Sequence, residues 1–223
     1  MSQIRFVGAI SRRSGMSLTA FSHHWRTTHK DTLMGFVSAG IIQGYVQNHR
    51  TDVMIEGLRS DYDGSPELWI RDADALAQMA SSEEFRYALE VDSPRFINMP
   101  PISFLVSETI VIEAIKREPP GTLLKLMLFI PHDHSNATQD SEWESVLKSA
   151  FSSNLLPRRL TRLTVVTADG KPDPSGIQGV ECSWWKDEKE LSEAWNARDR
   201  QPARGEPSIL LAREEIIRRL DVE

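Results

Sequence analysis

One order of predicted elements occurs twice in this chain, and this repetition limits the fold more than any other feature. Each half reads strand, helix, strand, strand, helix, strand, and the charged, Pro- and Gly-rich run KREPPG separates the halves at residues 116–121. Such runs between apolar stretches are typical of linkers. The sequence therefore predicts two ferredoxin-like βαββαβ halves at residues 1–115 and 122–223, joined by a linker at 116–121.

Hydrophobic periodicity sets the expected elements, because β-branched, alternating runs indicate strands and three- to four-residue spacing indicates helices. A sheet with helices on one face must bury its other face, and two such halves can cover each other. We therefore expect an α+β fold in which two tandem ferredoxin-like repeats form a pseudo-dimeric α+β barrel. The expected elements are residues 4–10, 18–37, 41–49, 64–70, 72–89 and 102–112 in the first half, and 123–130, 141–151, 159–167, 176–185, 187–197 and 208–217 in the second.

Composition narrows the class of partner. Of 223 residues, 40% are hydrophobic and 26% charged, and the net charge of −6 gives no footprint for nucleic acid or an anionic membrane surface. The lone Cys182 cannot form an internal disulfide, and we expect neither a signal peptide nor a transmembrane segment, so the predicted location is cytoplasmic. The expected partner is a small molecule, and an exposed apolar edge could still pair two chains as a homodimer.

Histidine is unevenly distributed. Four of the six, His23, His24, His29 and His49, lie within the first 49 residues. At 3.6 residues per turn, helical rotation separates His24 from His29 by about 140°, so we expect no three-histidine zinc site on this helix. His29 on the helix and His49 on the next strand are expected to approach one cavity, where either could transfer a proton. Each could equally be an ordinary surface or partly buried histidine.

Two further side chains complete the predicted catalytic set. Tyr45 shares a strand face with His49 by period-two alternation and could donate a hydrogen bond to a carbonyl or enolate oxygen. Asp63, at the start of the third strand, could orient His29 or His49, as carboxylates do in acid–base sites. Glu67 in mid-strand must face solvent or be paired, because a lone buried carboxylate is costly.

The predicted binding set is mainly aromatic. Aromatic side chains at helical and strand spacing are commonly core, but around a cavity they would line an apolar pocket. Arg50 is a candidate for binding a substrate carboxylate. No metal or cofactor is expected, since the HDH run at 132–134 sits at a strand end and the sequence lacks dinucleotide, phosphate-loop and nucleophile-elbow motifs. The predicted substrate-binding residues are Phe21, His24, Trp25, Tyr62, Trp69 and Arg50.

Three spaced motifs carry a resemblance to a known family. They are LTAFSHHWRTTH at residues 18–29, GYVQNH at 44–49 and YDGSPELW at 62–69, followed by the strand FLVSETIVI at 104–112. Over about residues 3–113 the chain resembles the EthD family of the dimeric α+β barrel superfamily. The resemblance implies a cavity between sheet and helices and proton transfer by His, Tyr and Asp without a cofactor. The second half, where Trp143 has no histidine four residues on, looks like a degenerate copy.

The resemblance also implies a class of reaction, since relatives in the superfamily include cyclases, decarboxylases and isomerases. We expect a cofactor-independent isomerase that shifts a double bond or its cis–trans geometry in a small aromatic-derived or ring-opened unsaturated carboxylic or keto acid, in aromatic compound catabolism. Fold does not determine function, so two alternatives stay open. One is a polyketide-type cyclase or decarboxylase that uses the same residues, and the other is a non-catalytic small-molecule binding protein.

Overall fold

The computed structural model describes residues 3–113, 121–132, 156–167, 173–197 and 207–219. The expected helix at 141–151 and most of the expected linker at 116–121 lie outside the described residues. The division into two tandem repeats therefore stays a prediction. Within the described residues the fold is mixed α+β, with antiparallel strands of the closed-barrel type, which confirms the predicted fold class.

The chain packs as two compact units that interleave along the sequence. Unit 1 contains residues 1–50, 62–106 and 214–223, and unit 2 contains residues 51–61 and 107–213. A segment from the middle of the first half thus belongs to unit 2, and the end of the chain belongs to unit 1. The two units are described separately below.

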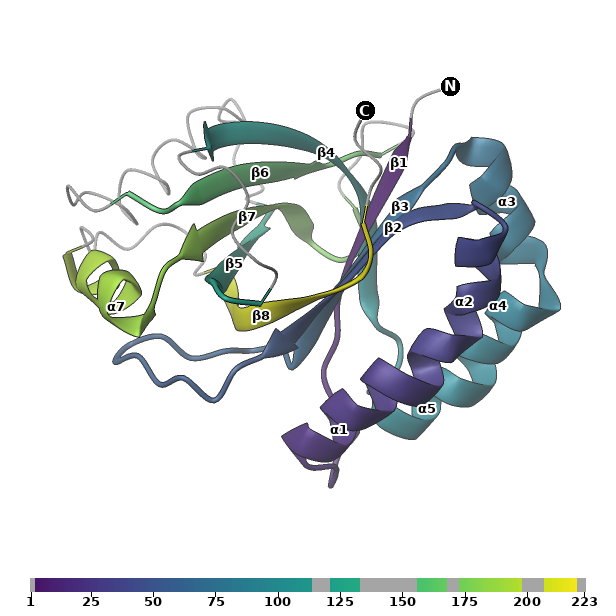
Figure 1. The fold of residues 1–223 in the computed structure, drawn as a ribbon, viewed down its shortest axis with the longest axis horizontal. Helices are drawn as coiled ribbons and strands as arrows, with labels where there is room; N and C mark the ends of the chain where they lie inside the picture. Colours follow the sequence, from purple (N-terminus) through teal and green to yellow (C-terminus); the bar gives the residue numbers. More distant parts are fainter. Residues whose placement is uncertain (1–2, 114–120, 133–155, 168–172, 198–206, 220–223) are drawn as a thin grey trace. The chain divides into compact units, whose positions relative to one another are not determined.

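Unit 1 is an antiparallel sheet with helices on one face (Figure 1). Its strand order is β4-β1-β3-β2, with Ile4 opposite Ile70 in the β1–β3 pair and His49 opposite Gly64 in the β2–β3 pair. The strands are β1 (Ile4–Ala9), β2 (Ile42–Arg50), β3 (Gly64–Ile70) and the first part of β4 (Ile102–Glu113). The helices are α1 (Leu18–His24), α2 (Lys30–Ser38), α3 (Ala73–Ser81), α4 (Glu83–Tyr87) and α5 (Ser93–Phe96), with π-helical turns η1 (Trp25–His29) and η2 (Ala88–Asp92).

The helices of unit 1 begin where short polar side chains can cap them. Ser17 accepts a hydrogen bond from the backbone N–H of Ala20, and Asp72 accepts one from that of Ala75. Ser82 caps α4 in the same way, which explains the break that separates α3 from α4. Leucine, isoleucine and aromatic side chains then join the helices to the sheet in one core, which includes Leu33, Phe36, Ile42, Tyr45, Leu68 and Ile70.

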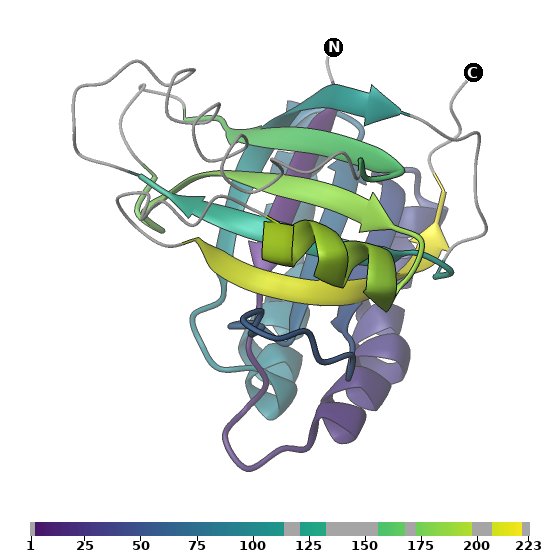
Figure 2. The same cartoon turned by 90° about the vertical axis from the view of Figure 1, so that its left-hand side faces the viewer.

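Unit 2 has strand order β8-β5-β7-β6, formed by β5 (Leu124–Pro131), β6 (Arg159–Val165), β7 (Ile177–Trp185) and the first part of β8 (Ser208–Arg218). Helix α7 (Glu188–Ala197) lies across these strands (Figure 2). Ile55 and Leu58, from the segment between β2 and β3, pack into the core of unit 2 with Leu126 and Trp185. None of the described helices is long and apolar enough to span a membrane.

Candidate functional site

A π-helical turn changes which face of the first helix the histidines occupy. The backbone N–H of Lys30 donates to the carbonyl of Trp25, five residues back, so residues five apart come close together. His24 and His29 are five apart, and both reach Asp92: the His24 Nε2–Asp92 Oδ1 distance is 2.9 Å and the His29 Nδ1–Asp92 Oδ2 distance is 2.8 Å. The predicted separation of about 140° is therefore wrong, because it assumed an unbroken α-helix.

Asp92 lies fully buried at the end of the second π-turn, η2. Burial alone raises the pKa of this carboxyl, but hydrogen bonds from His29 and His24 outweigh burial and leave its pKa lowered. The Asp92 carboxylate therefore accepts from both imidazole rings. Phe96 stacks on His24 at 4.8 Å and touches His29 at 4.9 Å between ring centroids, so both rings are packed in place.

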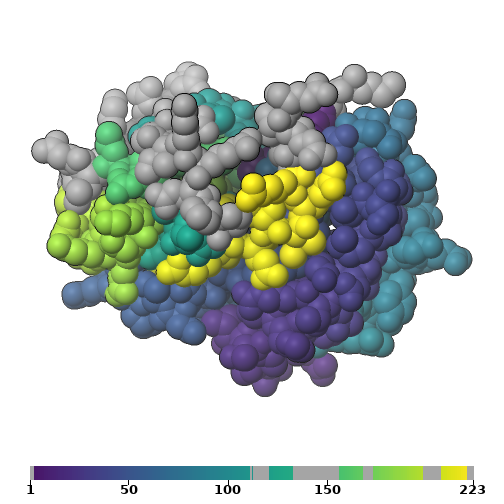
Figure 3. Space-filling view, in the orientation of Figure 1, coloured from purple at the N-terminus to yellow at the C-terminus, as the bar shows by residue number. Residues whose placement is uncertain are grey.

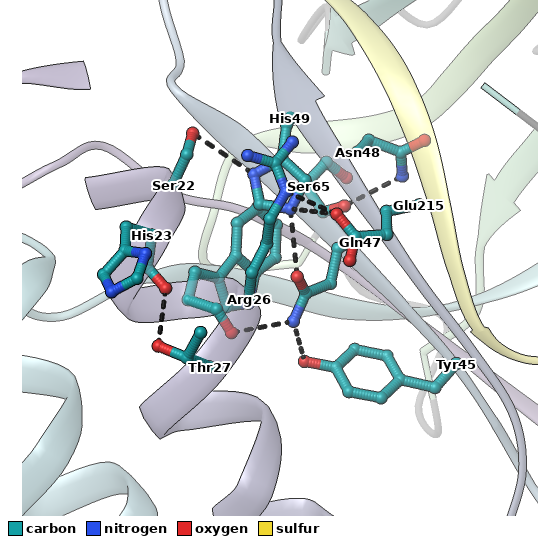
Figure 4. A network of polar contacts seen from close by, with 11 residues as sticks. Ser22, His23, Arg26, Thr27, Tyr45, Gln47, Asn48, His49, Ser65 and Glu215 are labelled. Atoms are coloured by element: carbon teal, nitrogen blue, oxygen red, sulfur yellow. Dashed lines mark hydrogen bonds and ion pairs between the residues drawn. The ribbon is translucent and has the colours of Figure 1, made fainter. Parts of the chain in front are cut away.

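A second histidine centre forms on β2, where Tyr45, Gln47 and His49 share one face (Figure 4). The side chain of Gln47 links the other two: its Nε2 donates to the Tyr45 hydroxyl at 2.7 Å, and its Oε1 lies 2.9 Å from Nε2 of His49. On the other side of the ring, Ser22 Oγ lies 3.3 Å from His49 Nδ1. Tyr45 and His49 thus share a strand face and are linked through Gln47, which the predicted catalytic set did not include.

The hydrogen-bond network determines the tautomer of His49. Gln47 Nε2 also donates to the backbone carbonyl of Trp25 at 3.1 Å, and since a carbonyl can only accept, the orientation of the Gln47 amide is set. Oε1 of Gln47 therefore faces His49 and accepts from Nε2–H. The lone pair of the ring is then on Nδ1, where the Ser22 hydroxyl donates to it.

Burial strongly shifts the pKa of both titratable groups on this face. Burial, helped by the positive charge of Arg26, lowers the pKa of His49 to about 3, so the ring is neutral at physiological pH. Burial raises the pKa of Tyr45 to about 12, although hydrogen bonds from the Gln47 and Trp25 side chains lower it. Tyr45 therefore stays a neutral phenol that can donate its own proton.

The last strand brings a carboxylate to His49. Glu215 Oε2 lies 3.8 Å from His49 Nε2 and accepts a hydrogen bond from Nε of Arg26, one residue after Trp25. Ile217, two residues after Glu215, packs against the core of unit 1, so period-two alternation places Glu215 on the same face of β8. The site thus combines α1, η1, β2 and the end of β8.

The motif Tyr62-Asp63-Gly64 supports the site by a different route from the predicted one. Asp63 does not orient a histidine, because Arg12 and Arg50 hold its carboxylate: Arg12 donates through its backbone N–H at 2.9 Å and through its guanidinium, and Arg50 through Nη1 at 3.2 Å. Gly64 matters by having no side chain, since a Cβ there would overlap with the Trp25 ring. That ring packs on His49, 4.5 Å away between centroids.

The predicted binding residues do not converge on one pocket. Phe21 is a core residue against Trp25 and Phe96, His24 belongs to the Asp92 cluster, and Tyr62 lies partly buried before β3. Trp69 lies on the opposite face of the sheet from Leu68 and Tyr45, with the Arg5 guanidinium 4.6 Å above its ring. Glu67 is on that opposite face too, and it is paired with Arg5 and Asn48 as the sequence required.

Several functional candidates escaped the sequence analysis. Gln47 and Ser22 stand on the predicted elements, but amides and hydroxyls are common on any polar face and gave no signal. Asp92 could be found only by knowing that η1 and η2 lie together. Glu215 is 166 residues from His49, and only the alternation with Ile217 in β8 indicates its face.

The first part of the chain, which contains most of this site, is similar to a known domain family. Residues 13–100 match the family model of the EthD domain. Over this part of its length the chain is similar to the EthD domain. The EthD match includes Ser22, Arg26, Tyr45, Gln47 and His49 but ends well before Glu215. The curated proteins contain no match to the chain.

Solved structures support the fold of the chain. An anthrone oxidase-like protein has a TM-score of 0.57 at 12% identity, with 97% of this chain and 94% of that chain covered. A mutant chlorite dismutase from Candidatus Nitrospira defluvii has a TM-score of 0.51 at 8% identity, with 96% and 91% covered. A candidate monooxygenase from Fusobacterium nucleatum has a TM-score of 0.50 at 11% identity, with 99% and 97% covered. At these identities the likeness concerns the fold alone.

Proposed function

We propose that this protein is a cofactor-independent enzyme that transfers a proton on a small, aromatic-derived unsaturated or keto acid. The observation that carries the proposal is the hydrogen-bonded line from Tyr45 through Gln47 and His49 to Ser22. It combines a neutral imidazole of defined tautomer with a phenol that keeps its proton, which are the two groups that enolisation of a ketone requires. The names of the structural neighbours also refer to small-molecule enzymes.

His49 would accept the proton at Nδ1, directly or through the Ser22 hydroxyl, because Nε2–H is held by Gln47. The C–H bond next to the substrate carbonyl breaks, the proton moves to Nδ1, and the electron pair moves to the carbonyl oxygen to give an enolate or dienolate. Return of the proton to a different carbon shifts the double bond without changing composition. A positioned base of this kind contributes about 10²–10⁴-fold to the rate.

Tyr45 would stabilise the enolate oxygen. Its hydroxyl accepts from Gln47 Nε2, which leaves the O–H of the phenol free to donate to a developing oxyanion. A pKa of about 12 keeps that proton in place throughout the physiological range. Isomerisation is the simplest outcome of this chemistry, and ring closure or decarboxylation through the same enolate is the runner-up.

A non-catalytic binding protein is the second candidate, and one observation favours it. The pKa of His49 is lowered to about 3, and a base this weak removes a carbon-bound proton poorly unless the bound substrate stabilises the imidazolium. In that case the network would only satisfy a buried polar face. The two candidates differ in whether a bound keto acid exchanges protons with solvent.

Solvent exchange tests the proposal without knowledge of the physiological substrate. Phenylpyruvate is a small aromatic keto acid whose benzylic protons exchange with D₂O only through the enol, and proton NMR follows their loss. We expect the protein to accelerate this exchange and His49→Gln to lower the acceleration by about 10²-fold or more. His29→Gln is the matched control, since His29 faces Asp92, and it should retain the rate. Equal rates in wild type and His49→Gln would refute the catalytic role.

A further inference from the structure

The ion pair between Arg26 and Glu215 is the solvent-accessible part of the site beside His49. The side chain of His49 is 3% exposed, whereas those of Arg26 and Glu215 are 44% and 39% exposed. Glu215 touches both the arginine and the ring, since its Oε2 accepts from Arg26 Nε and lies 3.8 Å from His49 Nε2. A ligand that reaches the ring from this side must therefore meet Arg26 and Glu215 first.

Two elements that are distant in the sequence form this pair. Arg26 is part of the π-turn η1, and Glu215 stands near the end of β8, two residues before the core residue Ile217. In Figure 3 the yellow atoms of the last strand lie next to the purple atoms of the first helices. Exposed ion pairs contribute little to stability, so exchange of one partner for another carboxylate costs little.

The guanidinium of Arg26 suits a carboxylate ligand. Within the described residues, Arg26 binds Glu215 through Nε alone, which leaves the planar fork of Nη1 and Nη2 available to a ligand. Arginine forks bind carboxylates through two parallel hydrogen bonds, with more geometric specificity than a point charge gives. By contrast, Arg12 and Arg50 already share the carboxylate of Asp63.

We propose that Arg26 is the residue that recognises the carboxylate of an anionic substrate, in competition with Glu215. The inference rests on the proposed function for its substrate class. Arg26 takes the place of Arg50, which the sequence predicts as the carboxylate-binding residue. A substrate carboxylate on Arg26 places the rest of a small molecule beside His49. It also releases Glu215, which stands within 3.8 Å of Nε2 and can pair with the imidazolium when His49 accepts a proton.

Binding of an acid and of its ester isolates the carboxylate charge. The dissociation constants of phenylpyruvate and of its methyl ester are measured by calorimetry on the full chain. We expect the wild-type protein to prefer the acid and Arg26→Gln to weaken acid binding about tenfold while leaving the ester unchanged. Glu215→Gln should tighten acid binding several-fold, because it removes the competing carboxylate. Arg86→Gln, on an exposed arginine paired with Glu83, is the matched control and should change neither constant.

Several results would overturn the inference. Arg26 does not recognise the carboxylate if the wild-type protein binds acid and ester equally well or does not bind the acid. The same conclusion follows if Arg26→Gln weakens the binding of both ligands equally. Weaker acid binding by Glu215→Gln would exclude the competition. An Arg26-dependent preference for the acid without solvent exchange would uphold the inference and refute the proposed function. If the benzylic protons of the acid and of the ester exchange with solvent at equal rates, the proposed function stands and the inference about Arg26 fails.

Discussion

At the scale of single residues, the site depends on one missing side chain. A Cβ on Gly64 would overlap with Cζ3 of Trp25 and lie 3.0 Å from its Cη2, so the indole occupies the space that any other residue would fill. The same indole packs against His49, and its backbone carbonyl orients Gln47. Gly64 therefore controls both the position of the ring and the network around it.

Gly64→Ala should displace Trp25 and destabilise the protein. Inserting a methyl group into a packed region costs about 1–3 kcal/mol, and chemical denaturation followed by tryptophan fluorescence measures the loss. Gly35→Ala is the matched control, because Gly35 lies inside α2 with nothing within 4 Å of an added Cβ. It should stabilise the protein by about 0.5–1 kcal/mol. Equal effects of the two substitutions would contradict the packing of Trp25 on Gly64.

At the scale of elements, the π-turns explain why two histidines separated by five residues share one carboxylate. Asp92 accepts from His24 and His29 and so joins η1 to η2. Within the helix, Thr27 Oγ1 donates to the carbonyl of His23 at 2.7 Å, a contact that competes with regular helical hydrogen bonding. The helical turn is therefore held by tertiary contacts as well as by its own backbone.

Asp92→Asn should weaken the contact between the two π-turns. An amide has one acceptor oxygen where the carboxylate has two, so one imidazole N–H loses its partner in a buried site, at a cost of about 1–3 kcal/mol. Urea denaturation at pH 7 measures the change. Asp31→Asn, at an exposed position of α2, is the control and should stay within about 0.5 kcal/mol of wild type. The account of η1 and η2 fails if both variants are equally stable.

Periodicity predicted the elements well and the site only in part. Alternation predicted the strands and three- to four-residue spacing predicted the helical ranges, because these signals are local. The joining of Tyr45 to His49 was predictable for the same reason, since both stand on one strand face. A π-turn leaves no period in the sequence, so the partners of His24 and His29 were missed. Asp63 was assigned to a histidine because Arg12 lies 51 residues away and gave no signal.

At the scale of the whole molecule, the two units exchange segments. Residues 214–223 belong to unit 1 although they follow the strands of unit 2, and residues 51–61 belong to unit 2 although β2 and β3 flank them. The candidate site therefore includes residues from the last strand, because Glu215 and Ile217 both belong to β8.

Truncation after Arg213 should destabilise unit 1 and remove the ion pair of Arg26. Loss of Ile217 exposes part of the unit 1 core, and burial of an isoleucine contributes about 1.5–3 kcal/mol when complete. Thermal unfolding followed by circular dichroism should show a lower Tm for this truncation than for a control that ends at Arg219. Identical melting of the two truncated chains would show that the end of β8 is not part of unit 1.

The stability of the protein should also depend on pH through Glu181 in unit 2. Burial raises the pKa of Glu181 to about 8, although the charge of Arg162 lowers it. The folded state then keeps a proton on Glu181 that the unfolded state loses above about pH 4.5. This group therefore makes the free energy of unfolding fall as pH rises from about 4.5 to 8, by at most about 1.4 kcal/mol per pH unit.

Glu181→Gln should therefore raise the free energy of unfolding more at pH 7.5 than at pH 4.5, as measured by urea denaturation. The exposed Glu193 provides the control, and Glu193→Gln should show no such difference. A gain for Glu181→Gln that is the same at both pH values would contradict the raised pKa.

The protonation state of His49 is the central claim, because both the proposed chemistry and its alternative begin from a neutral ring with its lone pair on Nδ1. Nitrogen-15 NMR of the imidazole, recorded from pH 4 to pH 8, measures it directly. The structure predicts a neutral Nε2–H tautomer over this whole range, since the pKa of His49 is lowered to about 3. Titration of His49 near the ordinary imidazole pKa of about 6.5, or an Nδ1–H tautomer, would contradict it.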